Sequence, residues 1–169
     1  MVWFLDLNAN DSHLATGGVG HTGGMREEEL VDRARTMVRG GGGRLTRPRE
    51  HILRTLARLG GHPTAGQIHA ALGEEDAPHL STTYRTLESL CAAGVLSHVH
   101  VDHGEPTFHF SAAVSGRPHV HAACSGCGSV VDLPTEVVAP VADYLRDNGY
   151  EPHLGHTALS VTCSECARD

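Results

Sequence analysis

The spacing of apolar residues along the chain changes near residue 95. Before that point they recur every three or four positions, which is the period of an amphipathic helix. Residues that commonly cap helices stand at the start of two of these apolar-periodic stretches. They are Thr46 in one stretch and Ser81 or Thr82 in the other. The pattern predicts four helices, within segments 26–39, 45–61, 64–73 and 80–94.

Short apolar runs replace the helical period after residue 95. Two runs within 95–110, separated by a turn at 102–106, predict a β-hairpin. Three short helices followed by such a hairpin are typical of a winged helix-turn-helix, a DNA-binding unit. The remaining chain predicts two strands within 120–133, a helix over 135–149 capped by Thr135, and a last strand within 156–166. The predicted fold class is therefore α+β, with a winged helix followed by a small α/β domain.

The charges divide the chain at the same place. The net charge is −7, and the chain contains no lysine. Ten arginines against nine acids leave residues 26–97 near +1, whereas three arginines against nine acids leave residues 98–169 near −6. An arginine-bearing first half is compatible with DNA contact despite the negative total. Residues 1–24 are small and polar without periodicity, and we expect a disordered tail there.

The sequence pattern predicts neither a membrane span nor a signal peptide. Apolar runs stay well short of the roughly 18 residues that a membrane span needs, and MVWFL at the start is too short for a signal-peptide core. We therefore expect a cytoplasmic protein without a membrane partner. In that compartment, four of five cysteines arranged as two C-x-x-C pairs indicate metal binding rather than disulfides.

The two cysteine pairs are the strongest chemical signal. Spacing of two residues lets both thiolates of a knuckle face one ion, and two knuckles complete a zinc site with four thiolate ligands. The 35 residues between the pairs contain a predicted helix and strand, so zinc would clamp the ends of the α/β domain. Two redox dithiols are the alternative. The predicted ligands are Cys124, Cys127, Cys163 and Cys166, whereas Cys91 lies on an apolar helical face and is expected to be a buried small hydrophobe.

Histidine is frequent, with 14 in 169 residues. Two H-x-H pairs fall on predicted strands, His98 with His100 and His119 with His121. Because residues i and i+2 of a strand point to one face, both imidazoles of a pair can reach one ion. The histidines expected to be ordinary surface or core residues are His13, His21, His51, His69, His79, His103 and His153.

Four stretches carry a resemblance to a known family: LTRPREHIL, STTYRTLESLCAAGVL, HVHAACSGCGSVVDLP and CSEC. Together they resemble the ferric uptake regulator family of metal-dependent bacterial repressors. The resemblance covers about residues 26–167 and matches the cysteine pairs to the family's structural zinc site. It implies a winged-helix DNA-binding domain at 25–110, a hinge at 111–118 and an α/β dimerisation domain at 119–169.

The resemblance also implies a metal sensor at the hinge. The corresponding places in this chain hold His62, His109, His119 and His121. The stretch SHVHVDHGEPTFHF looks like the nickel-responsive branch, which implies a second regulatory site formed by His98, His100 and His156. An all-imidazole sensor suits nickel, zinc or cobalt and lacks the carboxylates that suit manganese and help iron. Nickel or zinc is therefore favoured as the regulatory ion, with iron or manganese as alternatives.

The segment STTYRTL opens the third helix of the winged motif, whose N-terminal end enters the major groove in this class of proteins. Base or phosphate contacts are therefore expected from Tyr84 and Arg85, phosphate contacts from Thr82 and Thr83, and a backbone contact from Arg49 on the preceding helix. Packing of Tyr84 in the core is the alternative for that residue.

The predicted function is a metal-responsive repressor that binds a pseudo-palindromic DNA operator as a homodimer. One alternative is an iron-, manganese- or peroxide-responsive member of the same family. Another is a metal-independent winged-helix regulator whose zinc is purely structural. An enzyme is disfavoured, because the chain has no helix-borne H-E-x-x-H motif and no thioredoxin-like setting for its cysteine pairs.

Overall fold

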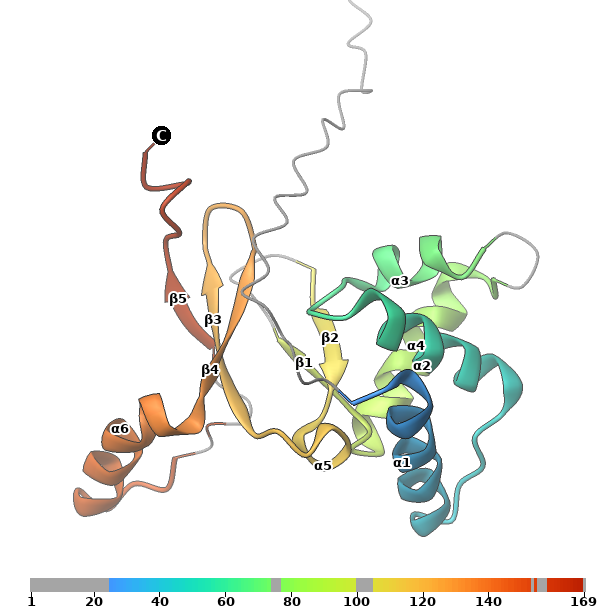
Figure 1. Cartoon of the computed structure of the whole chain (residues 1–169), viewed down its shortest axis with the longest axis horizontal. Coiled ribbons are helices and arrows are strands. Elements are labelled where there is room, and N and C mark those ends of the chain that lie inside the picture. The colour runs from blue at the N-terminus through green and yellow to red at the C-terminus, as the bar shows by residue number, and fades with distance from the viewer. Residues whose placement is uncertain (1–24, 74–76, 100–104, 153, 155–157, 169) are drawn as a thin grey trace, which may run out of the picture.

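The structure is a computed structural model, and it describes residues 25–73, 77–99, 105–152, 154 and 158–168. Figure 1 shows α1 to α4 gathered on one side, the hairpin β1–β2 and the short helix α5 in the middle, and the sheet β3–β5 with α6 on the other side. This arrangement confirms the predicted α+β class with a winged helix followed by a smaller α/β unit. The predicted tail at 1–24 lies outside the described residues.

The first unit is built by helices α1 (Glu27–Gly40), α2 (Arg47–Leu59), α3 (Ala65–Ala71) and α4 (Leu80–Ala92). Their apolar faces meet in one core, which includes the fully buried side chains of Ile52, Ile68 and Leu87. Complete burial of such a side chain contributes about 1.5–3 kcal/mol. The helical period of the sequence therefore predicts the core well, although Leu59 lies at the end of α2 and is 45% exposed.

Two helix starts differ from the sequence-based expectation. Helix α4 begins before Ser81, because His79 is its N-cap and the His79 imidazole accepts the Ser81 N–H at 3.4 Å. Helix α6 (Thr135–Asp147) has Pro134 as its N-cap, so Thr135 is the first helical residue and not the cap. The differences are between one and three residues, and they leave the predicted helices in place.

The wing consists of β1 (Leu96–Val99) and β2 (Thr107–Phe110). The strands pair antiparallel, as the hairpin prediction requires, and part of the predicted turn lies outside the described residues. Strand β2 also contacts the segment that leads into α3. The Phe108 N–H donates to the Pro63 carbonyl at 2.9 Å, and Thr107 forms a bridge with Thr64. The wing is thereby fastened to the start of α3, beside which it runs in Figure 1.

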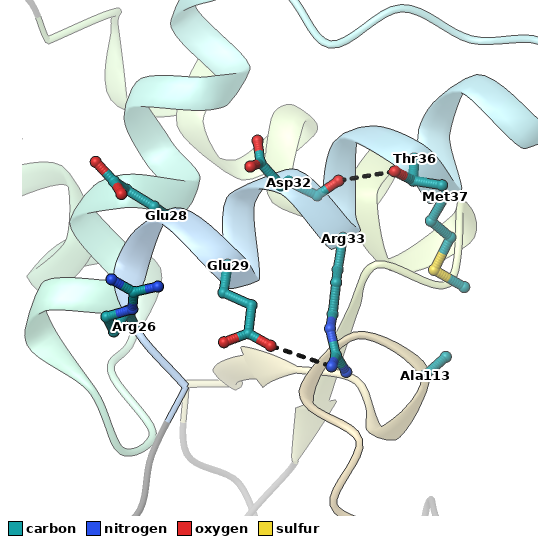
Figure 2. Close-up of a pocket in the computed structure, with 8 residues that line it drawn as sticks. All are labelled: Arg26, Glu28, Glu29, Asp32, Arg33, Thr36, Met37 and Ala113. Atoms are coloured by element: carbon teal, nitrogen blue, oxygen red, sulfur yellow. Dashed lines mark hydrogen bonds and ion pairs between the residues drawn. The ribbon is translucent and has the colours of Figure 1, made fainter.

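The segment expected to be the hinge contains the short helix α5 (Ala112–Ser115). Val114 is 1% exposed and belongs to the core of the first unit. Arg33 of α1 donates to the Val114 carbonyl at 3.4 Å and also pairs with Glu29. Figure 2 shows this guanidinium reaching the turn of α5, beside an open surface hollow that contains none of the predicted metal ligands. The first part of segment 111–118 is therefore packed on the first unit through α5.

The second unit is a sheet of β3 (His119–Cys124), β4 (Val130–Pro134) and β5 (Ala158–Val161), with α6. Strand β3 lies in the centre, antiparallel to β4 and parallel to β5. Helix α6 buries Val138 and Ala142. This strand order brings the two cysteine pairs, at the ends of β3 and β5, to the same end of the sheet.

The other face of α6 is apolar and exposed. Val137, Val141 and Tyr144 follow helical spacing and are 62%, 57% and 68% exposed. We call these three residues the α6 apolar face. Exposed apolar residues nearby in the sequence or sheet are Val131, Tyr150, Leu159 and Val161. A contiguous exposed apolar surface marks an interaction site.

Within the described residues, none of the helices combines the length and hydropathy that crossing a lipid bilayer requires.

Candidate metal centres

The first candidate centre is the cysteine cluster at the end of the second unit. One Sγ atom from each of four cysteines lies within 4.8 Å of all the others, and the ligands are Cys124, Cys127, Cys163 and Cys166. The chain between the first two must pass close to the cluster. A Cβ atom added at Gly126 would lie 2.8 Å from the Cys166 Sγ atom. Glycine is therefore required at this place in the knuckle, because any larger residue would displace a thiol.

The cysteine cluster has the electrostatics of a cation site. Backbone N–H groups of Cys163, Cys127 and Gly126 lower the pKa of the Cys124 thiol to about 6. Contacts with the thiols of Cys163, Cys127 and Cys124 raise the pKa of Cys166 to about 12. The backbone thus stabilises the Cys124 thiolate, whereas ionisation of Cys166 beside it is unfavourable. A bound divalent cation offsets the repulsion between the thiolates. Zinc fits the donor set, because it commonly takes four thiolate ligands in structural sites.

The second candidate centre joins the two units of the fold. It contains His62 from the loop before α3, His119 and His121 from β3, and Asp132 from β4, with one ligand atom of each within 4.8 Å of the others. The Asp132 Oδ1 atom lies 2.7 Å from His62 Nε2, 3.2 Å from His121 Nδ1 and 3.7 Å from His119 Nε2. We call these four residues the histidine–aspartate cluster.

The orientation of His119 supports metal binding by this cluster. Its Nδ1–H donates to the carbonyl of Arg117 at 2.7 Å, which leaves the lone pair on Nε2, the atom that faces Asp132. A backbone acceptor that fixes the tautomer in this way is the usual supporting arrangement of a metal-binding histidine. Two electron-rich atoms that face each other across 3.7 Å are stabilised by a cation between them.

His109 adds a further imidazole to the histidine–aspartate cluster. It comes from β2, and its ring centroid lies 4.8 Å from His62, 5.3 Å from His119 and 4.6 Å from His121. Burial, reinforced by the neighbouring imidazoles, lowers the pKa of His109 to about 3. The ring is therefore neutral at pH 7 and can offer a lone pair. Buried ring atoms without a hydrogen-bond partner in the described residues are His109 Nδ1 and His62 Nδ1.

Asp132 is a candidate metal ligand that the sequence analysis did not name. Burial acts to raise the pKa of its carboxyl, but hydrogen bonds from His121 and His62 outweigh burial and hold that pKa well below the usual range. The carboxylate is thus ionised in the cluster. The sequence analysis named only imidazoles for the sensor, whereas in the structure a carboxylate lies among the histidines.

The comparison with known proteins identifies the family. The model described as the ferric uptake regulator family matches residues 41–162. The chain belongs to the ferric uptake regulator family. The zinc uptake regulation protein of Mycobacterium tuberculosis strain H37Rv is 33% identical over 130 residues, which cover 74% of this chain and 95% of that protein. The ferric uptake regulation protein of Brucella abortus strain 2308 is 34% identical over 130 residues, which cover 76% of this chain and 89% of that protein.

A solved structure supports the same family fold. The ferric uptake regulator of Helicobacter pylori, whose structure is described as revealing three functional metal binding sites, matches with a TM-score of 0.67 and 19% identity. The match covers 86% of this chain and 96% of that one. The chain is about equally similar to a zinc and to a ferric uptake regulator. These identities therefore do not distinguish between the two metals.

The residues expected to contact DNA differ in their exposure and in their contacts within the protein. Thr82 and Arg85 are exposed on α4. Tyr84 is half-buried against the core, and its hydroxyl donates to Glu105. Arg49 donates to the Ser89 hydroxyl at 3.1 Å, so its guanidinium ties α2 to α4.

Thr83 is not placed to contact phosphate, contrary to the expectation from the sequence. Its side chain is fully buried, and its hydroxyl lies 3.2 Å from His69 Nδ1. The spacing of Thr83, Leu87 and Leu90 places all three on the buried face of α4. A phosphate cannot reach this hydroxyl while the helix stays packed.

The second regulatory site expected for the nickel-responsive branch of the family is described only in part. His98 is exposed on β1, opposite Phe108 in the hairpin. His100 and His156 lie outside the described residues. This site stays a prediction.

Proposed function

We propose that the chain is a zinc-responsive transcriptional repressor that binds a pseudo-palindromic operator as a homodimer. The single observation that carries this proposal is the histidine–aspartate cluster, whose ligands come from both units of the fold. The cysteine cluster is assigned a structural zinc. A regulator of this kind acts on DNA in the cytoplasm and is not an enzyme.

The position of the cluster suggests how an ion controls DNA binding. His62 precedes α3 in the winged-helix unit and His109 lies on its wing, whereas His119, His121 and Asp132 belong to the sheet. A bound divalent ion supplies positive charge that draws these donors together. The residues thereby favour one angle between the units, and that angle sets the separation of the two α4 helices in a dimer. Such coupling is typically about 1–3 kcal/mol, or roughly 5–150-fold in DNA affinity.

The donor atoms favour zinc over nickel as the regulatory ion. Three imidazoles and one carboxylate make a four-ligand set of types that zinc commonly takes, and zinc is usually four-coordinate. The carboxylate removes the reason for preferring nickel that an all-imidazole set gave. His109 as a fifth donor, together with Asp132, favours an iron-responsive regulator as the second candidate, because Fe(II) takes mixed histidine and carboxylate ligands in sites of higher coordination.

Dimer formation is assigned to the α6 apolar face. Three large apolar side chains on one helix face are more than half exposed, and apolar residues of β5 add to the exposed surface of the same unit. A surface that pairs with its own copy about a two-fold axis gives a symmetric dimer. The two α4 helices of that dimer would present Arg85 and Thr82 to two half-sites, which is why a pseudo-palindromic operator is expected.

The proposal is tested by a metal titration of DNA binding. A duplex is first selected from a random pool in separate selections with the protein loaded with Zn²⁺, Ni²⁺, Fe²⁺ or Mn²⁺, and fluorescence anisotropy then measures affinity with each of these ions added. We expect zinc to tighten binding of the wild type and not of His62→Ala. His51→Ala, which removes a histidine of α2 outside both clusters, is the matched control and should keep the response.

The outcomes separate the parts of the proposal. If no metal changes the affinity of the wild type, the chain is not a metal-responsive regulator. If iron or nickel acts and zinc does not, the regulatory function stands and the choice of zinc is wrong. If His62→Ala responds as fully as the wild type, the histidine–aspartate cluster is not the sensor.

A further inference from the structure

Glu105 connects three elements near the surface expected to contact DNA. It lies just before β2, and its Oε1 atom accepts a hydrogen bond from the Tyr84 hydroxyl of α4. The same oxygen accepts the Gly66 N–H, in the first turn of α3, at 3.4 Å. The carboxylate also raises the pKa of the Tyr84 hydroxyl, because the hydrogen bond favours the protonated phenol. One acidic side chain of the wing thus holds the only aromatic residue of α4.

A short and stiff path leads from Glu105 to the histidine–aspartate cluster. Pro106 follows Glu105 and restricts its backbone to extended conformations, so Glu105 moves with β2. Strand β2 carries His109, whose ring lies against the cluster. The path therefore runs from an imidazole that lies against the histidine–aspartate cluster to the Tyr84 hydroxyl, within a few residues of one strand.

A second connection runs through the segment that carries His62. The next residue, Pro63, accepts the Phe108 N–H at 2.9 Å, and Thr64 bridges Thr107. The Thr64 side chain and Gln67 form a reciprocal capping box that fixes the start of α3. His62 and His109 therefore belong to two segments that are bonded to each other. The His62 segment leads to Gly66, which donates to Glu105, and the His109 strand begins just after Glu105.

We propose that Glu105 is a positioning residue that transmits the state of the histidine–aspartate cluster to Tyr84 on the DNA-contacting helix. Donors drawn together at the cluster fix β2 and the segment before α3, and Glu105 then holds the Tyr84 ring at the angle that DNA requires. Glu105 itself need not touch DNA. This inference rests on the proposed function, since it concerns how the same sensor controls operator binding.

A simpler role for Glu105 makes a different prediction. A carboxylate near DNA repels phosphate, and its removal would then tighten binding to any duplex by the same factor with or without metal. A positioning role instead changes the ratio between the affinities with and without metal. That ratio is the quantity to measure, because a purely local contact or a uniform charge effect leaves it unchanged.

The experiment measures this ratio on the full-length protein with its structural zinc retained, using the selected duplex and Zn²⁺ as the probe. Glu105→Ala should lower the zinc-induced gain in affinity by roughly two- to thirtyfold, the range expected for residues that modulate coupling. Glu105→Gln keeps an acceptor oxygen without the charge and should retain most of the gain. Glu88→Ala removes an exposed carboxylate from α4 and serves as the matched control, with the gain unchanged.

Tyr84→Phe keeps the ring and removes the hydroxyl, so it should reduce the zinc-induced gain as Glu105→Ala does. The double variant should lose no more than Glu105→Ala alone, because that change already removes the contact that Tyr84→Phe breaks. Equal zinc-induced gains in the wild type and Glu105→Ala, with both proteins folded by circular dichroism, would overturn the inference and leave the proposed function intact. A wild type without any zinc-induced gain would overturn both.

Discussion

Replacement of Asp132 by asparagine is the sharpest test of the histidine–aspartate cluster. The change removes the negative charge and keeps the shape of the side chain. In the structure, the Asp132 Oδ1 atom lies 2.7 Å from His62 Nε2 and 3.2 Å from His121 Nδ1. We expect Asp132→Asn to bind the regulatory ion more weakly and to lose much of its metal-dependent operator binding.

The size of the effect follows from two opposing costs. Hydrogen bonds to a charged group contribute about 1.5–3 kcal/mol and those between neutral groups about 0.5–1.5 kcal/mol. Weakening both bonds therefore destabilises the metal-free variant by about 2 kcal/mol. Loss of a residue that merely supports a ligand lowers metal affinity about 10–100-fold, and loss of a direct carboxylate ligand costs at least as much. A measured loss of affinity already contains both costs, so we expect a net weakening of about tenfold, or ~1.4 kcal/mol, at the lower end of that range.

The assay is competition for Zn²⁺ against a chromophoric chelator at pH 7, with the structural zinc retained. Asp143→Asn is the matched control, because Asp143 is an exposed aspartate on α6 that pairs with Arg146 at 2.8 Å. Thermal melting followed by circular dichroism establishes that both variants are folded. A folded Asp132→Asn protein with zinc affinity within about twofold of the wild type would refute the assignment of this carboxylate to the metal site.

Three further changes test other parts of the molecule. Cys163→Ser should release the structural zinc and weaken dimerisation, because metal at such a site contributes directly to folding; zinc-replete dimers in sedimentation would contradict this. Arg85→Ala should weaken operator binding by about 1–3 kcal/mol if the guanidinium contacts a base, and unchanged affinity in a folded variant removes Arg85 from the interface. His109 has its pKa lowered to about 3, so between that pH and about 6.5 the unfolded chain binds a proton that the folded chain does not. The free energy of unfolding should therefore fall as the pH drops through this window, by about 2 kcal/mol from pH 7 to pH 5. Urea unfolding of the wild type and of His109→Gln, each without metal at the sensor site, measures this change. An equal pH dependence in the two proteins contradicts the prediction.

The elements of the fold were predictable because their causes are local. Apolar residues at helical spacing form the core of the first unit, and short apolar runs form the wing and the sheet. The cysteine cluster was predictable for the same reason, since each C-x-x-C pair is a local knuckle and only the meeting of the two pairs depends on the fold. The resemblance to the family supplied the grouping of His62 with His109, His119 and His121, which local patterns do not contain.

The misplaced ends and contacts arise where several residues compete for one role. Ser81, Thr82 and Thr83 all have the chemistry of a cap or a phosphate ligand. The structure assigns the cap to His79 and buries Thr83 with Leu87. The burial of Thr83 could have been predicted, because it stands four residues before Leu87 on the apolar stripe of the helix, and a residue on that stripe cannot also face DNA.

Asp132 shows where a sequence contains a signal that composition and motif spacing do not reveal. A knuckle that turns at Gly126 and Cys127 joins two antiparallel strands, and that turn sets His121 opposite Asp132. Cross-strand partners point to the same face of a sheet, so the H-x-H pair and this carboxylate must share one side of the hairpin. The register therefore places an acid among the imidazoles before any tertiary contact is considered. What the register cannot supply is His62, which is 70 residues from Asp132 and reaches it only because the segment before α3 is bonded to β2. The part of the site within the sheet is fixed by local pairing, whereas its link to the DNA-binding unit depends on how the two units pack. A sensor needs this division, because only the second part can change when the metal leaves.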